Sequence, residues 1–217
     1  IDDSIQAGVF EMGVAASGDL KRCCRYFKPQ VGVITNIGID HLQAFDSLDS
    51  YIKAKGEFLD GLNNEGTLII NADNDYIKKI DLSGYKGSVI YYGFDEKSHF
   101  KVSDIAEKQN GISFNLKHED SIYTVFVPGF AEYNAYNACA AIAAANAVGM
   151  DIQEAVLRLK TFENVEKHFE PFLGINGSII IDDTWSTNPT SCKTALKQLK
   201  SIAKGRKTIA ALGRMSL

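Results

Sequence analysis

The sequence has few cysteines and no long apolar run. Its four cysteines among 217 residues include the adjacent pair Cys23 and Cys24 and form no C-x-x-C motif. This spacing argues against a disulfide framework and a zinc ribbon, so a reducing compartment, the cytoplasm, is expected. No apolar run reaches the ~20 residues of a membrane-spanning helix, and we expect no membrane segment.

The chain also lacks a charge bias and a phosphate loop. Its formal net charge is −4 with both signs scattered, so we expect no nucleic-acid partner and no membrane-surface patch. It contains no G-x-x-x-x-G-K-[ST] motif and no initial methionine. Because strand-like runs stand close to both ends, we expect a piece of a longer protein.

Strand-like and helix-like segments alternate through the first half of the chain. This alternation predicts an α/β fold, a mostly parallel sheet flanked by helices. The predicted strands are 7–12, 31–35, 67–71 and 88–92, with helices over 18–27 and 46–62. Three short alternating segments then predict a small antiparallel sheet, at 101–105, 112–117 and 121–127.

The second half predicts two helices and then a change of domain. Small apolar residues make 132–150 a largely buried helix, and 151–160 follows as another. The charged, irregular stretch that comes next marks a boundary, which divides the chain into domains 1–164 and 165–217. The second domain is expected to contain a buried strand at 178–181, a helix that starts at Pro189 with Asn188 as its cap, and a strand at 207–212.

Polar side chains recur where predicted strands end. Glu11, His41, Asn71 and Asp183 each stand at or just past the carboxyl end of a strand. Open α/β sheets bind ligands at that edge, so we expect a ligand or metal site there. The alternative for Glu11 is a salt bridge to a loop lysine.

Lys55 stands on the apolar face of its helix, in line with Leu48 and Tyr51. A lysine in that position extends its amine to solvent, pairs with a carboxylate, or loses its charge. A lysine covering apolar surface is the plain alternative. The proximity of His41 and Glu11 in the predicted topology favours a functional site.

Asn134 and Asn137 lie in the first turns of the buried helix. Each amide offers a donor and an acceptor, which can read a planar heterocycle. For Asn134, helix capping is the alternative.

Together these motifs resemble the ATP-dependent Mur ligase family, most closely the branch that joins D-alanyl-D-alanine to a UDP-linked muramoyl tripeptide. The motifs that carry the resemblance, in order, are Glu11-Met12-Gly13, Thr35-Asn36-Ile37-Gly38 with Asp40-His41-Leu42, Ala54-Lys55-Gly56-Glu57, Asn71-Ala72-Asp73, Tyr133-Asn134 to Asn137-Ala138, and Asp182-Asp183-Thr184 with Asn188-Pro189 and Ser191. The resemblance spans nearly the whole chain. It implies a central ATPase domain without its first strand and phosphate loop, followed by the start of a Rossmann-like carboxyl-terminal domain.

The resemblance implies an amide ligase of peptidoglycan precursor synthesis that works through an acyl phosphate. ATP and Mg²⁺ would be its cofactors, and a UDP-sugar peptide and an amino acid or dipeptide its substrates. The residue roles that it implies are Mg²⁺ ligation by Glu11, His41 and a carbamylated Lys55, catalysis by Lys55 and His41, and nucleotide binding by Asn134, Asn137, Asp183, Lys167 and His168.

Two features leave alternatives open. Trp185-Ser186 replaces the family's usual Tyr-Asn, so the resemblance does not fix the identity of the substrate. Ligases of the folylpolyglutamate type or the cyanophycin type are the alternatives. Without a phosphate loop the chain is not expected to turn over ATP by itself, and a non-catalytic binding module is the other alternative.

Overall fold

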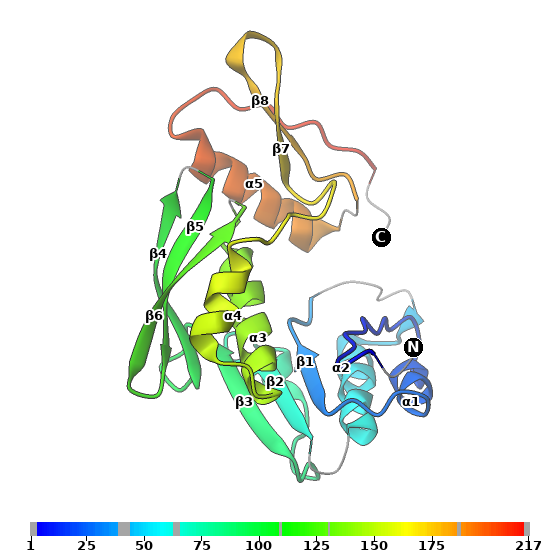
Figure 1. Cartoon of the computed structure of the whole chain (residues 1–217). Coiled ribbons are helices and arrows are strands. Elements are labelled where there is room, and N and C mark those ends of the chain that lie inside the picture. Colours follow the sequence, from blue (N-terminus) through cyan, green and yellow to red (C-terminus); the bar gives the residue numbers. More distant parts are fainter. Residues whose placement is uncertain are drawn as a thin grey trace.

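The computed structural model describes residues 4–38, 44–62, 66–108, 110–129, 131–185 and 188–214. Its main feature is a six-stranded sheet in the order β1-β2-β3-β4-β5-β6 (Figure 1). The strands are β1 (Val31–Ile34), β2 (Thr67–Asn71), β3 (Ser88–Gly93), β4 (Phe100–Lys108), β5 (Gly111–His118) and β6 (Ser121–Pro128). Strands β1 to β4 pair in parallel and β4 to β6 pair antiparallel, which confirms the predicted fold class.

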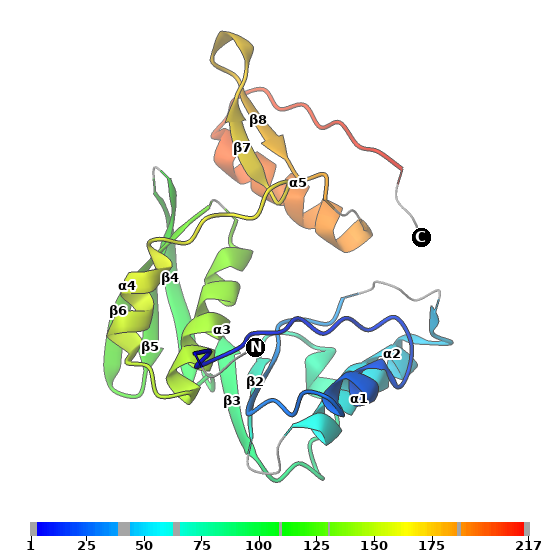
Figure 2. The same cartoon turned by 45° about the vertical axis from the view of Figure 1, so that its right-hand side comes forward.

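Helices cover both faces of the parallel half. The helices are α1 (Asp19–Cys24), α2 (Leu48–Gly56), α3 (Tyr133–Ala147) and α4 (Ile152–Leu159). In β2, Ile69 packs into the cluster under α3 and α4, whereas Leu68 and Ile70 pack into the cluster that includes α1 and α2. Alternate side chains of a strand face opposite ways, so β2 is buried on both sides. Figure 2 shows these helices from a second direction.

The predicted strand at 7–12 is wrong. This stretch has no regular secondary structure, and Val9 is fully exposed. Phe10 instead stacks on Phe27, with ring centroids 4.7 Å apart. A strand needs a hydrogen-bonded neighbour, and in the described part of the chain β1 pairs only with β2. For the same reason β1 is an edge strand, and its Val33 is 36% exposed although its β-branched residues are typical of a buried strand.

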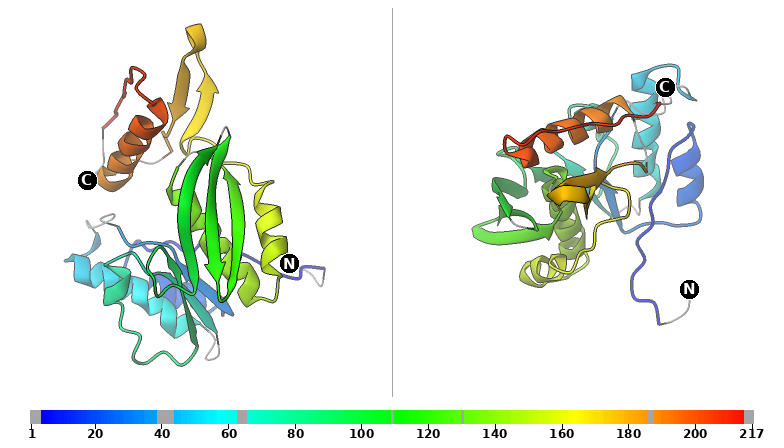
Figure 3. Two further views of the ribbon diagram at one scale, coloured as in Figure 1. Left: turned by 90° about the vertical axis from the view of Figure 1, so that its left-hand side faces the viewer. Right: turned by 90° about the horizontal axis from the view of Figure 1, so that it is seen from above.

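A smaller part follows α4. It consists of the hairpin β7 (Glu170–Leu173) and β8 (Ile179–Asp182) and the helix α5 (Pro189–Ala203). The predicted cap is confirmed, since Asn188 Oδ1 accepts the N–H of Ser191 at 2.8 Å. Figure 3 shows this part beyond one end of the antiparallel strands.

Two expectations for this smaller part are wrong. The strand at 178–181 was expected to be buried, but Ile179 and Ile180 are 50% and 56% exposed because the two-stranded hairpin leaves much of its surface uncovered. Residues 207–212 form no strand, and Ile209 is 80% exposed, since no described segment pairs with them. Among the described helices, none has the length and apolarity to cross a bilayer.

Candidate functional site

The carboxyl ends of the first three strands are tied together by side chains. Asn71 Nδ2 and the Tyr92 hydroxyl both donate to the carbonyl oxygen of Thr35, each at 3.2 Å. Asn74 Nδ2 donates to the carbonyl oxygen of Ile37 at 3.1 Å. These bonds fix the course of the chain as it leaves β1, at the edge where ligands bind in open sheets.

Helix α3 begins at the same edge. The Asp73 carboxylate follows β2 and accepts the N–H groups of Phe94 and Asp95 at 2.6 and 2.9 Å. It also hydrogen-bonds to Tyr136 in the second turn of α3. Burial, together with the nearby Asp73 charge, raises the pKa of the Tyr136 hydroxyl and keeps it protonated as a donor.

Asn134 lies buried in the first turn of α3, with 6% of its surface exposed. It packs against Gly129, where a Cβ atom would come within 2.7 Å of the Asn134 Nδ2. The cap of α3 is Glu132, so the capping alternative for Asn134 is wrong. Asn137, one turn later, is exposed. The first turns of α3 therefore carry one enclosed and one accessible amide.

Asp183 directly follows β8. Its Oδ1 accepts the N–H of Phe169 at 3.1 Å. Burial raises the pKa of the Tyr133 hydroxyl, and the negative charge of Asp183 adds to that rise. Asp183 also lines the same pocket as Gly129, the residue against which Asn134 packs.

Lys167 and His168 lie on the Asp183 side of the site. The N–H of Trp185 donates to the carbonyl oxygen of Lys167 at 3.3 Å, and the His168 ring lies 5.7 Å from the Trp185 ring. The Lys167 side chain is exposed. Both residues thus border the loop that follows Asp183.

Lys55 is half-buried on α2 rather than fully enclosed. Its Nζ lies 5.5 Å from the centre of the Tyr51 ring, a cation–π distance, and that ring packs 5.0 Å from the ring of Phe45. The lysine amine therefore lies against an aromatic face on its own helix. Its catalytic role stays a prediction.

The two other predicted metal ligands are not brought together by the described structure. Glu11 is exposed in the irregular segment before α1, and His41 lies outside the described residues. Across the described ranges, no group of three His, Cys, Asp or Glu side chains is arranged to hold a metal ion. The metal set of Glu11, His41 and Lys55 stays a prediction.

One residue of this region went unassigned in the sequence. Glu57 Oε2 accepts the N–H of Gly18 at 2.7 Å and so joins the end of the lysine helix to the start of α1, which follows Glu11. Gly18 has φ of 89°, a conformation that favours glycine. In the sequence, Gly18 before a predicted helix is a recognisable feature. Its hydrogen-bond partner Glu57, far away in the chain, could not be recognised.

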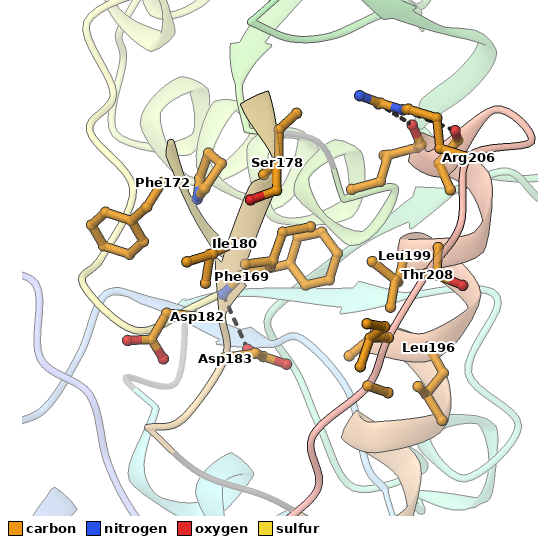
Figure 4. Close-up of a pocket in the computed structure, with 18 of the residues that line it drawn as sticks. Phe169, Phe172, Ser178, Ile180, Asp182, Asp183, Leu196, Leu199, Arg206 and Thr208 are labelled. Carbon is orange, nitrogen blue, oxygen red and sulfur yellow. Dashed lines mark hydrogen bonds between the residues drawn. The ribbon is translucent and has the colours of Figure 1, made fainter. Parts of the chain in front are cut away.

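A large, mostly apolar pocket lies between the β7–β8 hairpin, α5 and the segment after α5, and Asp183 is one of the residues that line it (Figure 4). Its volume is about 1550 Å³, and apolar side chains such as Ile180, Leu196 and Leu199 line it. Small-molecule pockets usually measure ~300–1,000 Å³ with a few convergent polar groups. This pocket is better described as the apolar face of the smaller part.

Comparison with known proteins gives consistent matches. The model of the Mur ligase middle domain matches residues 1–145. The chain is 29% identical over 213 residues to the UDP-N-acetylmuramoyl-tripeptide–D-alanyl-D-alanine ligase of Bacillus subtilis, covering 98% of this chain and 45% of that protein. It is 32% identical over 178 residues to the UDP-N-acetylmuramate–L-alanine ligase of Streptococcus pyogenes, covering 82% of this chain and 39% of that protein.

Solved structures agree with these sequence matches. A crystal structure of MurF from Acinetobacter baumannii superposes with a TM-score of 0.80 at 25% identity, covering 87% of this chain and 41% of that one. MurF from Thermotoga maritima shares the fold at 20% identity, with a TM-score of 0.77 and coverage of 87% and 43%. The chain spans less than half the length of the curated relatives it matches. Since the middle-domain match covers more than half of the chain, the chain belongs to the Mur ligase family.

Proposed function

We propose that this protein is an ATP-dependent amide ligase of peptidoglycan precursor synthesis, of which this chain is a part. The observation that carries the proposal is that Asp183 lines the same pocket as Gly129, the residue against which the buried Asn134 packs. An amide and a carboxylate at a sheet's carboxyl edge suit a purine and a ribose, respectively. The ligase names of the sequence relatives support the same reaction class.

In this proposal the carboxyl group of a UDP-sugar peptide is activated as an acyl phosphate, and the amine of an amino acid or dipeptide displaces the phosphate. Asn134 and Asn137 contact the base, Asp183 the ribose, and Lys167 and His168 the nearby phosphates. The proposed domains are 1–164 and 165–217, so nucleotide binding joins the two. This division is supported by the separate hairpin and helix that follow α4.

The donor set fits a hard cation. Glu11 would supply carboxylate oxygens from an exposed position, and a carbamate on the half-buried Lys55 would add further oxygens. With His41 these residues would hold Mg²⁺, which supplies neutralisation of phosphate charge when bound.

The test is ADP release by the full-length protein that carries this chain. We expect release that requires both an acyl substrate and an amine, with UDP-N-acetylmuramoyl-tripeptide plus D-alanyl-D-alanine as the first pair and UDP-N-acetylmuramate plus L-alanine as the second. Nucleotide binding without amine-dependent release, across both pairs and folylpolyglutamate-type substrates, would instead identify a binding module.

Asp183→Asn tests the nucleotide assignment in that protein. We expect the KM for ATP to rise by about 10-fold, the loss of one hydrogen bond to a charged group, with little change in the KM for the amine. Asp182→Asn is the matched control, because Asp182 also accepts one backbone N–H, that of Thr184 at 3.0 Å. A rise in the KM for the amine alone would instead assign Asp183 to the binding site of the amine substrate.

A further inference from the structure

The segment that joins α4 to β7 contains two left-handed residues, neither of which is glycine. Lys167 has φ of 61° and Phe169 has φ of 54°. A left-handed backbone is unfavourable for a residue with a Cβ atom, and it persists only where the surrounding contacts enforce it. Because such residues cluster at ligand sites and switches, the contacts that enforce this linker turn, residues 167–169, point to a role for it.

Two carboxylates hold the left-handed residues by their N–H groups. Glu170 Oε2 accepts the N–H of Lys167 at 2.9 Å. Asp183 Oδ1 accepts the N–H of Phe169 at 3.1 Å, the bond that is dashed in Figure 4. Hydrogen bonds to a charged acceptor are stronger than those between neutral groups. The linker turn is therefore held from two separate segments, the first residue of β7 and the residue after β8.

The carbonyl groups of the linker turn are held as well. Asn164 Nδ2 donates to the carbonyl oxygen of His168 at 2.6 Å, and the N–H of Trp185 donates to that of Lys167 at 3.3 Å. Phe169 is 5% exposed, so the end of the turn is also packed. The Lys167 side chain, in contrast, is exposed. These contacts fix the backbone of the turn and leave the lysine side chain at the surface.

We propose that Glu170 and Asn164 are positioning residues, which hold the linker turn against Asp183 and so present its side chains to the nucleotide. The inference rests on the proposed function, in which Lys167 and His168 contact the phosphates. Glu170 and Asn164 touch no ligand in this role. Without them the left-handed backbone is no longer enforced, and fewer molecules hold the turn ready. The apparent affinity for the nucleotide falls with that fraction.

Glu170→Ala in the full-length protein tests the proposal. We expect the KM for ATP to rise by about 10-fold, as for the loss of one hydrogen bond to a charged group, while the KM for the amine does not change. Amide hydrogen exchange over residues 165–170 should become faster. Glu170→Gln, which keeps an oxygen acceptor for the same N–H, should recover most of the affinity for ATP.

Glu166→Ala is the matched control, because it removes an exposed carboxylate from the same linker, and it should change neither readout. Asn164→Ala releases the turn at His168 and replaces Glu170→Ala if that variant does not fold. If the wild type forms no ADP, the proposed function fails, and exchange over 165–170 alone decides whether Glu170 holds the turn. If the wild type is active and Glu170→Ala matches Glu166→Ala in both readouts, the positioning role is overturned.

Discussion

At the scale of the residue, Lys55 shows how a helix can present a cation without enclosing it. Its amine stands 5.5 Å from the centre of the buried Tyr51 ring, one helical turn earlier. An aromatic face attracts the charged amine, whereas carbamylation requires the neutral one. The ring contact therefore favours the charged amine, and carbamylation would have to compete with it.

Lys55→Ala in the full-length protein should lower amine-dependent ADP release by about 100-fold, the upper end of the cost of removing a group that supports a metal site. A short carboxylate such as acetate should restore part of the activity, because it supplies oxygens in place of the carbamate. Lys53→Ala is the control, since Lys53 is exposed on the same helix. Wild-type turnover by Lys55→Ala would refute the role.

At the scale of the element, one carboxylate links β2, the turn after β3 and α3. Asp73 follows β2, accepts two N–H groups from the turn after β3, and bonds to Tyr136 of α3. Gly93, at the end of β3, has φ of 139°, and a Cβ there would meet Asp73 Oδ2 at 2.4 Å. The close approach explains why glycine ends that strand.

Tyr136→Phe should lower the free energy of unfolding by about 1–2 kcal/mol near pH 7, since it removes a donor to a charged group. Because the folded state raises the pKa of Tyr136, its contribution is complete below the usual pKa of about 10 and falls as the pH rises beyond it. The wild type should therefore lose stability more steeply than the variant above that pH.

Urea titrations at pH 7 and at alkaline pH measure this difference. Tyr26→Phe is the control, because the Tyr26 side chain is 81% exposed and should change neither value. Equal alkaline slopes for the wild type and Tyr136→Phe would contradict the assignment.

Elements with strong local signals were predictable from the sequence. Three elements could be predicted from residues close together in the sequence. They are β2 from its apolar run, α3 from its small residues, and the start of α5 from Asn188-Pro189. The runs at 7–12 and 207–212 were not, because an apolar run becomes a strand only beside a partner, and the described residues offer none. The short β7 was missed because left-handed residues, Lys167 and Phe169, precede it.

The candidate site could likewise be predicted only where its residues carry a local signal in the sequence. Asn134 and Asp183 are marked by a helix start and a strand end, which are local features. The partners of Glu57 and Asn74 are not marked, since their acceptors and donors lie 39 and 37 residues away in the chain. Pairing at such separations is decided by tertiary packing.

At the scale of the whole molecule, one side chain connects the antiparallel strands to α5. Glu107 accepts from the Ser201 hydroxyl at 2.9 Å through Oε1 and pairs with Lys204 Nζ at 3.3 Å through Oε2. A bulge between Ser103 and Ala106 interrupts β4 shortly before it. Bulges re-aim the residues that follow them, which accounts for a strand side chain that reaches another part of the chain.

Glu107→Ala should loosen α5 from the sheet without unfolding either part. Exposed ion pairs contribute ~0.2–1 kcal/mol, so we expect tryptic cleavage between the parts, at Lys160 and Lys167, to accelerate by up to about fivefold while the melting temperature barely changes. Glu154→Ala is the matched control, because it removes an exposed pair with Arg158, 3.2 Å apart, that lies within α4 alone. Cleavage at the same rate in both variants would mean that Glu107 does not hold the two parts together.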